Sequence, residues 1–399
     1  MKRLPEFLAE IMAIAGRECR LIRQDSKLRS LLLIAPLLNA IIVCGVYAPA
    51  YVTEVPIVVV QQDFSALSHR MIRWLNQHQK LEVIQTLPDL NGAEKLFDQG
   101  KIAGYVVLEK NFSLRLKRNE EARVLLFCDA GNMVLANTLS VAVQGVVQTM
   151  SAGLSMHKAR RLGAFKDQAQ ALAAPIRAEI RPIGNPSLSY ADFMLPGMLL
   201  TVLQQVILLG LALSWAGERE SQTSGELLSL SKRPWILLLG KNLPHFVLHF
   251  LWLLLFCGLV LPLSSVSSEA QIGSLFIFSL LFVTVMIAWG TWVSLVIGDR
   301  LGATQALMFL SVPSFILSGY TWPTASLPEA LQWFSQILPL THAATMFRKL
   351  YGAGFEISAF PRELGLLLLL LALHLLAAYV AVRRLQRGSQ IPASVAPNS

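Results

Sequence analysis

Six long runs of apolar residues divide this 399-residue chain, and none of them contains Asp, Glu, Lys or Arg. A bilayer core about 30 Å thick is crossed by roughly 20 residues of helix. One charged residue at the centre of such a helix costs at least ~2.5 kcal/mol. We therefore predict six transmembrane helices. The runs cover residues 31–50, 193–216, 246–263, 272–298, 303–320 and 364–382.

The first and fifth runs differ from the other four. The first also fits a cleaved signal peptide, because Ala48-Pro49-Ala50 is a small-residue sequence of the kind found at cleavage sites. However, 30 residues precede this run, more than a signal peptide normally carries, and its length suffices to span. We favour an uncleaved first helix. The fifth run is short and contains Pro313.

Lys and Arg are distributed unevenly around the predicted helices. With six crossings both termini share one side, and that side carries 15 Lys and Arg residues, whereas the short loops opposite carry three. Because basic loops stay in the cytoplasm, both termini are predicted to be cytoplasmic and residues 51–190 to lie outside. The net charge of +9 is then charge at the membrane edge, and it does not indicate a nucleic-acid partner.

Residues 51–190 are predicted to form an extracytoplasmic α/β domain inserted after the first helix. Helices follow the first two expected strands, and Asp89 is the expected N-cap of the second of them. From 132 to about 174 the chain is predicted to be helical, with glycines such as Gly145 and Gly153 as candidate breaks. The expected strands are 55–60, 81–86, 102–108 and 123–128.

Two segments on the predicted cytoplasmic side are candidates for contact with a soluble partner. Residues 1–30 form an amphipathic helix, in which apolar residues such as Ile11 and Ile14 recur at helical spacing before a basic end. Residues 217–245 form a short charged loop with a helical stretch before Pro234. A charged helix at the membrane edge suits docking, although a solvated loop explains the composition equally well.

Several short motifs, some in this loop and some elsewhere in the chain, resemble those of one transporter family. They are Glu218-Arg219-Glu220, Thr223-Ser224-Gly225-Glu226-Leu227-Leu228, Gly240-Lys241 with Pro244, Leu195-Pro196-Gly197, and Ser318-Gly319-Tyr320-Thr321-Trp322-Pro323 with Arg348 after it. In order, spacing and topology they resemble ABC-2-type (type-2 ATP-binding-cassette) transporter permeases over essentially the whole chain. The layout resembles the subgroup with a large periplasmic domain between transmembrane helices 1 and 2.

The resemblance implies a membrane all-α bundle of six transmembrane helices with the inserted α/β domain. A cytoplasmic helix (1–30) and transmembrane helix 1 (31–50) precede the outer domain (51–190). Transmembrane helices 2–6 (191–384) then include the coupling loop (217–245) and an outer re-entrant segment (320–362), and 385–399 is expected to be a disordered cytoplasmic tail. The residues implied to couple to an ATPase are Glu218, Arg219, Glu220, Thr223, Gly225, Glu226 and Leu227.

Another group of residues is predicted to shape the transport pathway. Pro196 cannot donate a backbone hydrogen bond, so a local bend is expected in the second transmembrane helix. Neutral polar side chains among the apolar runs suit an amphipathic drug-like or lipid-like substrate better than an ion. The pathway and helix-shaping candidates are Pro196, Gly197, Gln204, Gln205 and Pro313.

The chain lacks the glycine-rich phosphate loop that an ATPase needs. Its two Gly-Lys pairs, at 100–101 and 240–241, are not followed by Ser or Thr. We therefore expect no catalytic residues and no cofactor in this chain, with ATP and Mg bound by a partner ABC ATP-binding subunit. Other expected partners are a second copy or a paralogous permease, membrane lipids and a periplasmic adaptor. The expected location is a bacterial inner membrane.

Three other classes of protein were compared with this prediction. An ion-coupled carrier keeps ionisable groups at mid-membrane, and the apolar runs contain none beyond His249 and His374. His245 and His249 share a helix face, but no second ligand pair completes a metal or haem site. A lipoprotein-release exporter has about four spans. A non-transporting sensor or scaffold with a ligand-binding outer domain stays the alternative.

Overall fold

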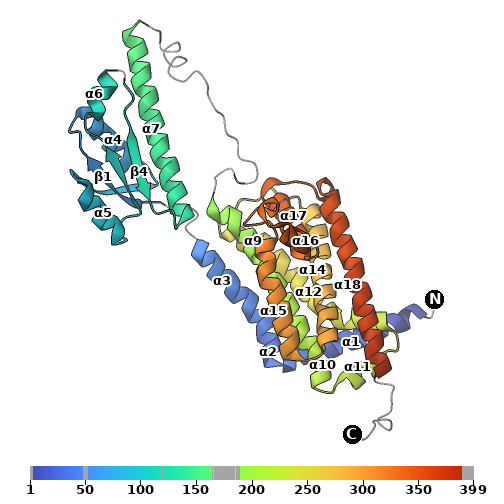
Figure 1. Ribbon diagram of the computed structural model, residues 1–399. Helices are drawn as coiled ribbons and strands as arrows, with labels where there is room; N and C mark the ends of the chain where they lie inside the picture. Colours follow the sequence, from blue (N-terminus) through green and yellow to red (C-terminus); the bar gives the residue numbers. More distant parts are fainter. Residues whose placement is uncertain are drawn as a thin grey trace. The chain divides into compact units, whose positions relative to one another are not determined.

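The computed structural model describes residues 3–47, 53–118, 120–163, 165, 185 and 189–388. Contacts divide the chain into two units, which we describe separately. Unit 1 is Met1–Ala50 with Arg181–Ser399, and unit 2 is Tyr51–Ile180. The described part of unit 1 consists of helices and the turns between them, whereas unit 2 contains a four-stranded sheet (Figure 1). The tail is predicted at 385–399, but residues 385–388 are the end of α18 (Pro361–Gly388), and residues from 389 onward lie outside the described residues.

The helices of unit 1 run side by side, with α1, α10 and α11 at one end of the bundle and α16 and α17 at the other (Figure 1). In chain order they are α1 (Arg3–Gln24), α2 (Ser26–Arg29), η1 (Ser30–Ile34), α3 (Ala35–Tyr47), α9 (Tyr190–Leu211), η2 (Ala212–Ala216), α10 (Gly217–Glu220), α11 (Ser224–Leu230), α12 (Pro234–Leu255), η3 (Phe256–Val260), α13 (Leu261–Leu263), α14 (Ile272–Ile297), α15 (Arg300–Leu317), η4 (Thr324–Ser326), α16 (Glu329–Gln336), α17 (Pro339–Ala353), η5 (Ile357–Ala359) and α18 (Pro361–Gly388).

The centre of unit 1 is formed by α9 and α14. Helix α9 contacts α3, α14, α15 and α17, and α14 also contacts α12 and α18. Leu203 of α9 and Phe282 of α14 are fully buried, whereas the outer helices expose apolar side chains such as Ile41 of α3 and Phe309 of α15. An apolar core inside an apolar outer surface is the arrangement that suits helices surrounded by lipid.

Several helical stretches extend beyond the predicted apolar runs, and the added turns carry charge. The run 246–263 is the second half of a helical stretch that begins at Pro234 and includes Lys241. The stretch that contains 193–216 continues through Glu218 to Glu220. The apolar runs themselves contain none of these charges, but several of the helical stretches that include the runs do. Lys241 can lie inside such a stretch because α1 supplies a buried counter-charge, Glu18.

Unit 2 is an α/β domain built on one mixed sheet. The strand order is β2-β1-β3-β4, with β1 parallel to β2 and to β3, and β4 antiparallel to β3. Asp89 caps α5 as predicted, because its side chain accepts from the backbone N–H of Gly92. The elements are β1 (Val55–Gln61), α4 (Ala66–Asn76), β2 (Leu81–Leu87), α5 (Leu90–Asp98), β3 (Gly104–Leu108), α6 (Phe112–Lys117), β4 (Val124–Cys128) and α7 (Met133–Arg161).

Both faces of β1 are covered, as its unbroken β-branched run indicates. Ile57 and Val59 pack with Met71 of α4 and with α6 and α7 on one face. Val58 and Val60 pack with α5 on the other. The four predicted strands are each present within two residues of their predicted limits.

Helix α7 differs from its prediction in two ways. It is continuous from Met133 to Arg161, so Gly145 and Gly153 do not break it, and its predicted end near residue 174 lies outside the described residues. A glycine inside a helix costs only about 1 kcal/mol. The burial of Val143 and Met150 against the sheet offsets that cost.

Seven described helical stretches are long and apolar enough to cross a membrane. Six overlap the six predicted runs, and the seventh is α7. Because α7 packs on the sheet of unit 2, its apolar face already has a partner other than lipid. The count of six crossings rests on this assignment of α7, and it stays a prediction.

Candidate functional site

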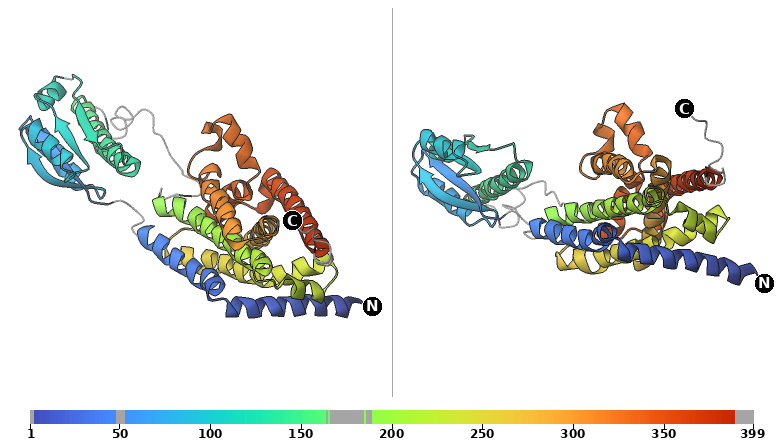
Figure 2. Two further views of the ribbon diagram at one scale, coloured as in Figure 1. Left: turned by 60° about the horizontal axis from the view of Figure 1, so that its bottom comes forward. Right: turned by 90° about the horizontal axis from the view of Figure 1, so that it is seen from below.

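Helix α1 packs closely on α12 at the end of unit 1 where α10 and α11 lie (Figure 2). Ile11 and Ile14 are buried in this contact. At Gly240 the two helices approach so closely that a Cβ would lie 2.7 Å from Cβ of Ile14. Only glycine permits that distance. In contrast, Leu8 and Met12 are 52% and 63% exposed, so α1 has one face on α12 and another open.

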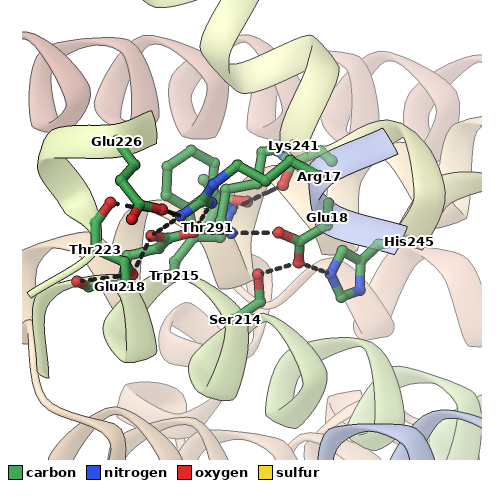
Figure 3. A network of polar contacts seen from close by, with 11 residues as sticks. Arg17, Glu18, Ser214, Trp215, Glu218, Thr223, Glu226, Lys241, His245 and Thr291 are labelled. Carbon is green, nitrogen blue, oxygen red and sulfur yellow. Dashed lines mark hydrogen bonds and ion pairs between the residues drawn. The ribbon is translucent and has the colours of Figure 1, made fainter. Parts of the chain in front are cut away.

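The same contact encloses a group of polar and charged side chains (Figure 3). They come from α1, from η2 and α10, and from α12, segments far apart in the sequence. Their carboxylate, ammonium and imidazole groups are at most 3% exposed. We call the group the junction cluster, and its members are Arg17, Glu18, Ser214, Glu218, Lys241 and His245.

Glu18 lies at one side of the junction cluster. Its Oε2 pairs with the ammonium of Lys241. Its Oε1 accepts from Ser214 Oγ at 2.6 Å and from His245 Nε2 at 3.0 Å. Burial acts to raise the pKa of Glu18, but Lys241 and His245 outweigh it, so the pKa lies well below its ordinary range. Glu18 is therefore ionised and fully hydrogen-bonded.

Glu218 lies at the other side and connects the junction cluster to α11. Its Oε1 is 2.9 Å from Lys241 Nζ and 2.5 Å from Arg17 Nη1. Its Oε2 accepts from Arg17 Nη2 at 3.1 Å and from Thr223 Oγ1 at 2.6 Å. Arg17 also reaches Glu226 Oε2 at 3.3 Å. One guanidinium thus joins α1 to both ends of the short segment that contains α10 and the start of α11.

The junction cluster pairs two cations with two carboxylates. Arg17 and Lys241 are positive, Glu18 and Glu218 are negative, and Lys241 lies between the two carboxylates. A buried charge is costly unless it is paired and hydrogen-bonded. Loss of any one of the four would leave another uncompensated, so the three elements are held in one arrangement.

The other coupling candidates face in different directions. Glu220 Oε2 accepts from the backbone N–H of Arg300 at 3.1 Å, and Arg219 Nη1 donates to the carbonyl oxygen of Leu295 at 3.3 Å. Leu227 is buried, and Gly225 has open space around it. Of the seven coupling candidates, only Gly225 and Glu226 lie on the open side of α11. The coupling role of the group stays a prediction.

A second set of motif residues meets at the opposite end of α9. The backbone N–H of Gly197 donates to Tyr320 Oη at 3.1 Å, and a Cβ on Gly197 would overlap the Tyr320 ring. Arg348 lies over that ring at 5.0 Å and donates to the Tyr320 carbonyl oxygen at 3.2 Å. Pro196 is buried inside α9. Motifs that are far apart in the sequence therefore form one packed contact.

The remaining pathway candidates occupy two neighbouring helices. Gln204 of α9 is fully buried and donates to Ser311 Oγ at 3.1 Å and Ser314 Oγ at 2.8 Å in α15. Gln205 of α9 and Pro313 of α15 are half-buried. Gln204 therefore fixes α9 to α15 in this structure. A role for these residues in a transport pathway stays a prediction.

The sequence interpretation missed Arg17 and Glu18 of α1 as partners of the loop that contains Glu218 and Lys241. One signal was present. Glu18 follows Ile11 and Ile14 by seven and four residues, so it lies on the apolar face of α1. An acid on an apolar face indicates a buried cation, and Lys241 with His245 at i, i+4 offers one. A metal role for His245 and His249 gains no support, because no group of three candidate ligands occurs in the described chain.

Comparison with known families identifies the class. The model of the ABC-2 family transporter protein matches residues 27–380. The matched stretch takes in Glu218, Lys241 and the Gly197–Tyr320 contact. The chain belongs to the ABC-2 family of transporter proteins, and it is a multi-pass membrane protein. The resemblance drawn from the sequence motifs is confirmed.

Several relatives in this family are known as permeases. The chain is 26% identical over 257 residues to the probable multidrug ABC transporter permease YbhS of Escherichia coli K12, which covers 64% of this chain and 66% of that protein, slightly under two thirds. It is 20% identical to YbhR of the same organism, also a probable multidrug ABC transporter permease, over 94% of this chain and 98% of that one. It is 30% identical to the linearmycin resistance permease protein LnrN of Bacillus subtilis, over 30% of each chain.

Proposed function

We propose that this chain is the permease subunit of an ATP-driven exporter, and that a separate ATP-binding subunit docks on α11 and the open face of α1. The junction cluster is the observation that carries this proposal. It links α11 to α1 and α12 through buried ion pairs. A displacement of α11 by a bound partner is then passed to α12 through short, charge-assisted bonds.

On the proposed docking surface, exposed residues of α11 lie above a buried leucine. Glu226 is 73% exposed and Gly225 is unobstructed, so both can meet a partner. Leu227 is buried beneath them and holds α11 to the bundle. Exposed Leu8 and Met12 on α1 add an apolar contact surface nearby. A rigid helix that is fixed from below suits the transmission of movement better than a mobile loop would.

The rest of the assembly follows from the same proposal. ATP and Mg are held by the partner, because this chain has no phosphate loop of its own. The chain pairs with a second permease copy, lies in a bacterial inner membrane, and keeps both termini in the cytoplasm, in agreement with its Lys and Arg distribution. The names of YbhS, YbhR and LnrN support a drug-like amphipathic substrate.

Affinity purification in mild detergent tests the proposal. The intact chain is purified from cells that express its genomic neighbours, and co-purified proteins are identified by mass spectrometry. We expect an ATP-binding-cassette subunit at equal stoichiometry, lost when Glu226→Lys reverses the exposed charge on the open side of α11. Glu329→Lys, a reversal at an exposed acid in α16, is the control. Recovery of the chain alone, or with a signalling protein, would favour a sensor or scaffold instead.

A further inference from the structure

A cavity of about 1070 Å³ opens beside the junction cluster, between α10, α11, α14 and α18. None of the cluster's members lines it, whereas Ser224 and Gly225 of α11 do, so it adjoins the proposed docking surface. Its walls are apolar side chains of α14 and α18, and its end near α10 is polar. No role predicted from the sequence accounts for it.

The cavity lining has an apolar part and a basic part, which match the two parts of an amphiphilic molecule. Val296 of α14 is 61% exposed, and Leu373, Leu376 and Val380 of α18 are 52%, 57% and 40% exposed. These side chains lie on helices apolar enough to cross a membrane, so this wall is continuous with the lipid-facing surface. At the polar end lie two arginines, Arg219 and Arg384, and none of the lining residues is acidic.

Arg219 is held away from the proposed docking surface by a contact with α14. Its guanidinium donates to the Leu295 carbonyl oxygen, which fixes it at the cavity rather than on the open side of α11. Arg384 reaches the same cavity from the last turns of α18, 165 residues later in the chain. Two cations from separate elements therefore line one largely apolar groove.

We propose that this cavity binds an anionic phospholipid from the cytoplasmic leaflet. The headgroup phosphate pairs with Arg219 and Arg384, and an acyl chain lies along Leu373, Leu376 and Val380. Basic pockets between transmembrane helices on the cytoplasmic side attract anionic headgroups. The apolar wall selects a lipid over a soluble anion, because a free phosphate gains nothing from it.

The lipid site gives Arg219 a function other than ATPase docking. Arg219 directly follows Glu218, so a lipid held by Arg219 biases the position of α10 and with it the junction cluster. Anionic lipid is then expected to be a ligand that stabilises this arrangement. The inference goes beyond the proposed exporter function, since lipid binding is measured on the permease whether or not an ATPase docks.

Native mass spectrometry of the purified full chain tests the site with phosphatidylglycerol and phosphatidylcholine as probes. We expect phosphatidylglycerol to be retained through delipidation and phosphatidylcholine to be lost. Each arginine is expected to contribute about fivefold in affinity, so R219Q/R384Q should lose about 25-fold. Arg387→Gln removes an exposed charge from the same end of α18 outside the cavity, and it should retain the lipid.

A second variant separates shape from charge. Leu376→Trp fills the groove and keeps both arginines, and it should also weaken phosphatidylglycerol retention. Equal retention in R219Q/R384Q and the unaltered protein would overturn the proposal, as would an equal loss in Arg387→Gln, which would indicate a general charge effect. Displacement of the lipid by inorganic phosphate alone would contradict the role given to the apolar wall.

Discussion

Lys241 is the residue whose surroundings are most demanding. It lies in a helix of apolar composition and is 1% exposed. Two carboxylates compensate its charge, and the Trp215 ring lies 5.4 Å away. An ion pair of this kind contributes less net stability than its Coulomb attraction suggests, but breaking it by removing one partner is strongly destabilising.

Replacement of Lys241 by Met should therefore destabilise the protein by about 3–5 kcal/mol. The cause is the pair of buried carboxylates left without their shared cation. E18Q/K241M should be more stable than K241M alone, because one of the two negative charges is gone. Melting temperatures in detergent measure both. Exposed Lys232→Met is the control, and a K241M protein that melts like the unaltered protein would refute the ion-pair account.

The low pKa of Glu18 gives a pH dependence of known sign. Because the folded pKa lies below the ordinary value of 4.5, the carboxylate contributes full stability above about pH 4.5, and that contribution is lost as pH falls further. The melting-temperature difference between the unaltered protein and Glu18→Gln should be constant from pH 8 to 6 and shrink below pH 4.5. A difference that already shrinks between pH 8 and 6 would contradict it.

The contact between Gly197 and Tyr320 predicts a steric effect. Gly197→Ala places a methyl group inside the Tyr320 ring, and overpacking of this kind costs about 1–3 kcal/mol. The additional substitution Tyr320→Ala should make the two effects less than additive. Gly258→Ala has no neighbour within 4 Å and should change little. Thermal unfolding distinguishes these variants, and fully additive effects would show that the residues act separately.

At the scale of elements, the sequence correctly predicted those features that depend on residues close together in the chain. The strands and Asp89 of unit 2 follow from β-branched runs and capping chemistry, which depend on neighbours in sequence. The start of α12 at Pro234 was missed, because hydropathy ends the run at the polar turns around Lys241. Those turns are helical because α1 supplies Glu18, a contact between residues 223 positions apart, and periodicity carries no information on such a pair.

Helix α7 shows that apolar composition alone does not identify a transmembrane helix. It is apolar enough to pass as a transmembrane span, yet its buried face packs on a sheet. In a cysteine-free background, Val141→Cys on α7 should react with a membrane-impermeant maleimide added outside intact spheroplasts. Ile41→Cys on α3 is similarly exposed in this structure and should be protected by lipid. Protection of both would place α7 in the membrane and exclude six crossings.

At the scale of the whole molecule, the family could be predicted from motif order, whereas the site could be predicted only in part. Glu218, Thr223 and Glu226 were selected for their motif. The structure shows that Glu218 is buried in the junction cluster and that Glu226 is exposed. The loop motif therefore contains both an inward anchor and an outward surface, a distinction that depends on α1 and cannot be read from the loop alone.

The central claim is that the outward surface of α11 receives the ATPase. Its most direct test is the ATPase rate of the reconstituted complex with Glu226→Lys, compared with Glu329→Lys, a reversal at an exposed acid in α16. The exposed pair of Glu226 with Arg17 contributes about 0–1 kcal/mol, so folding should persist. We predict about a tenfold loss of permease-stimulated ATPase activity for Glu226→Lys alone. Full stimulation in that variant would contradict the claim.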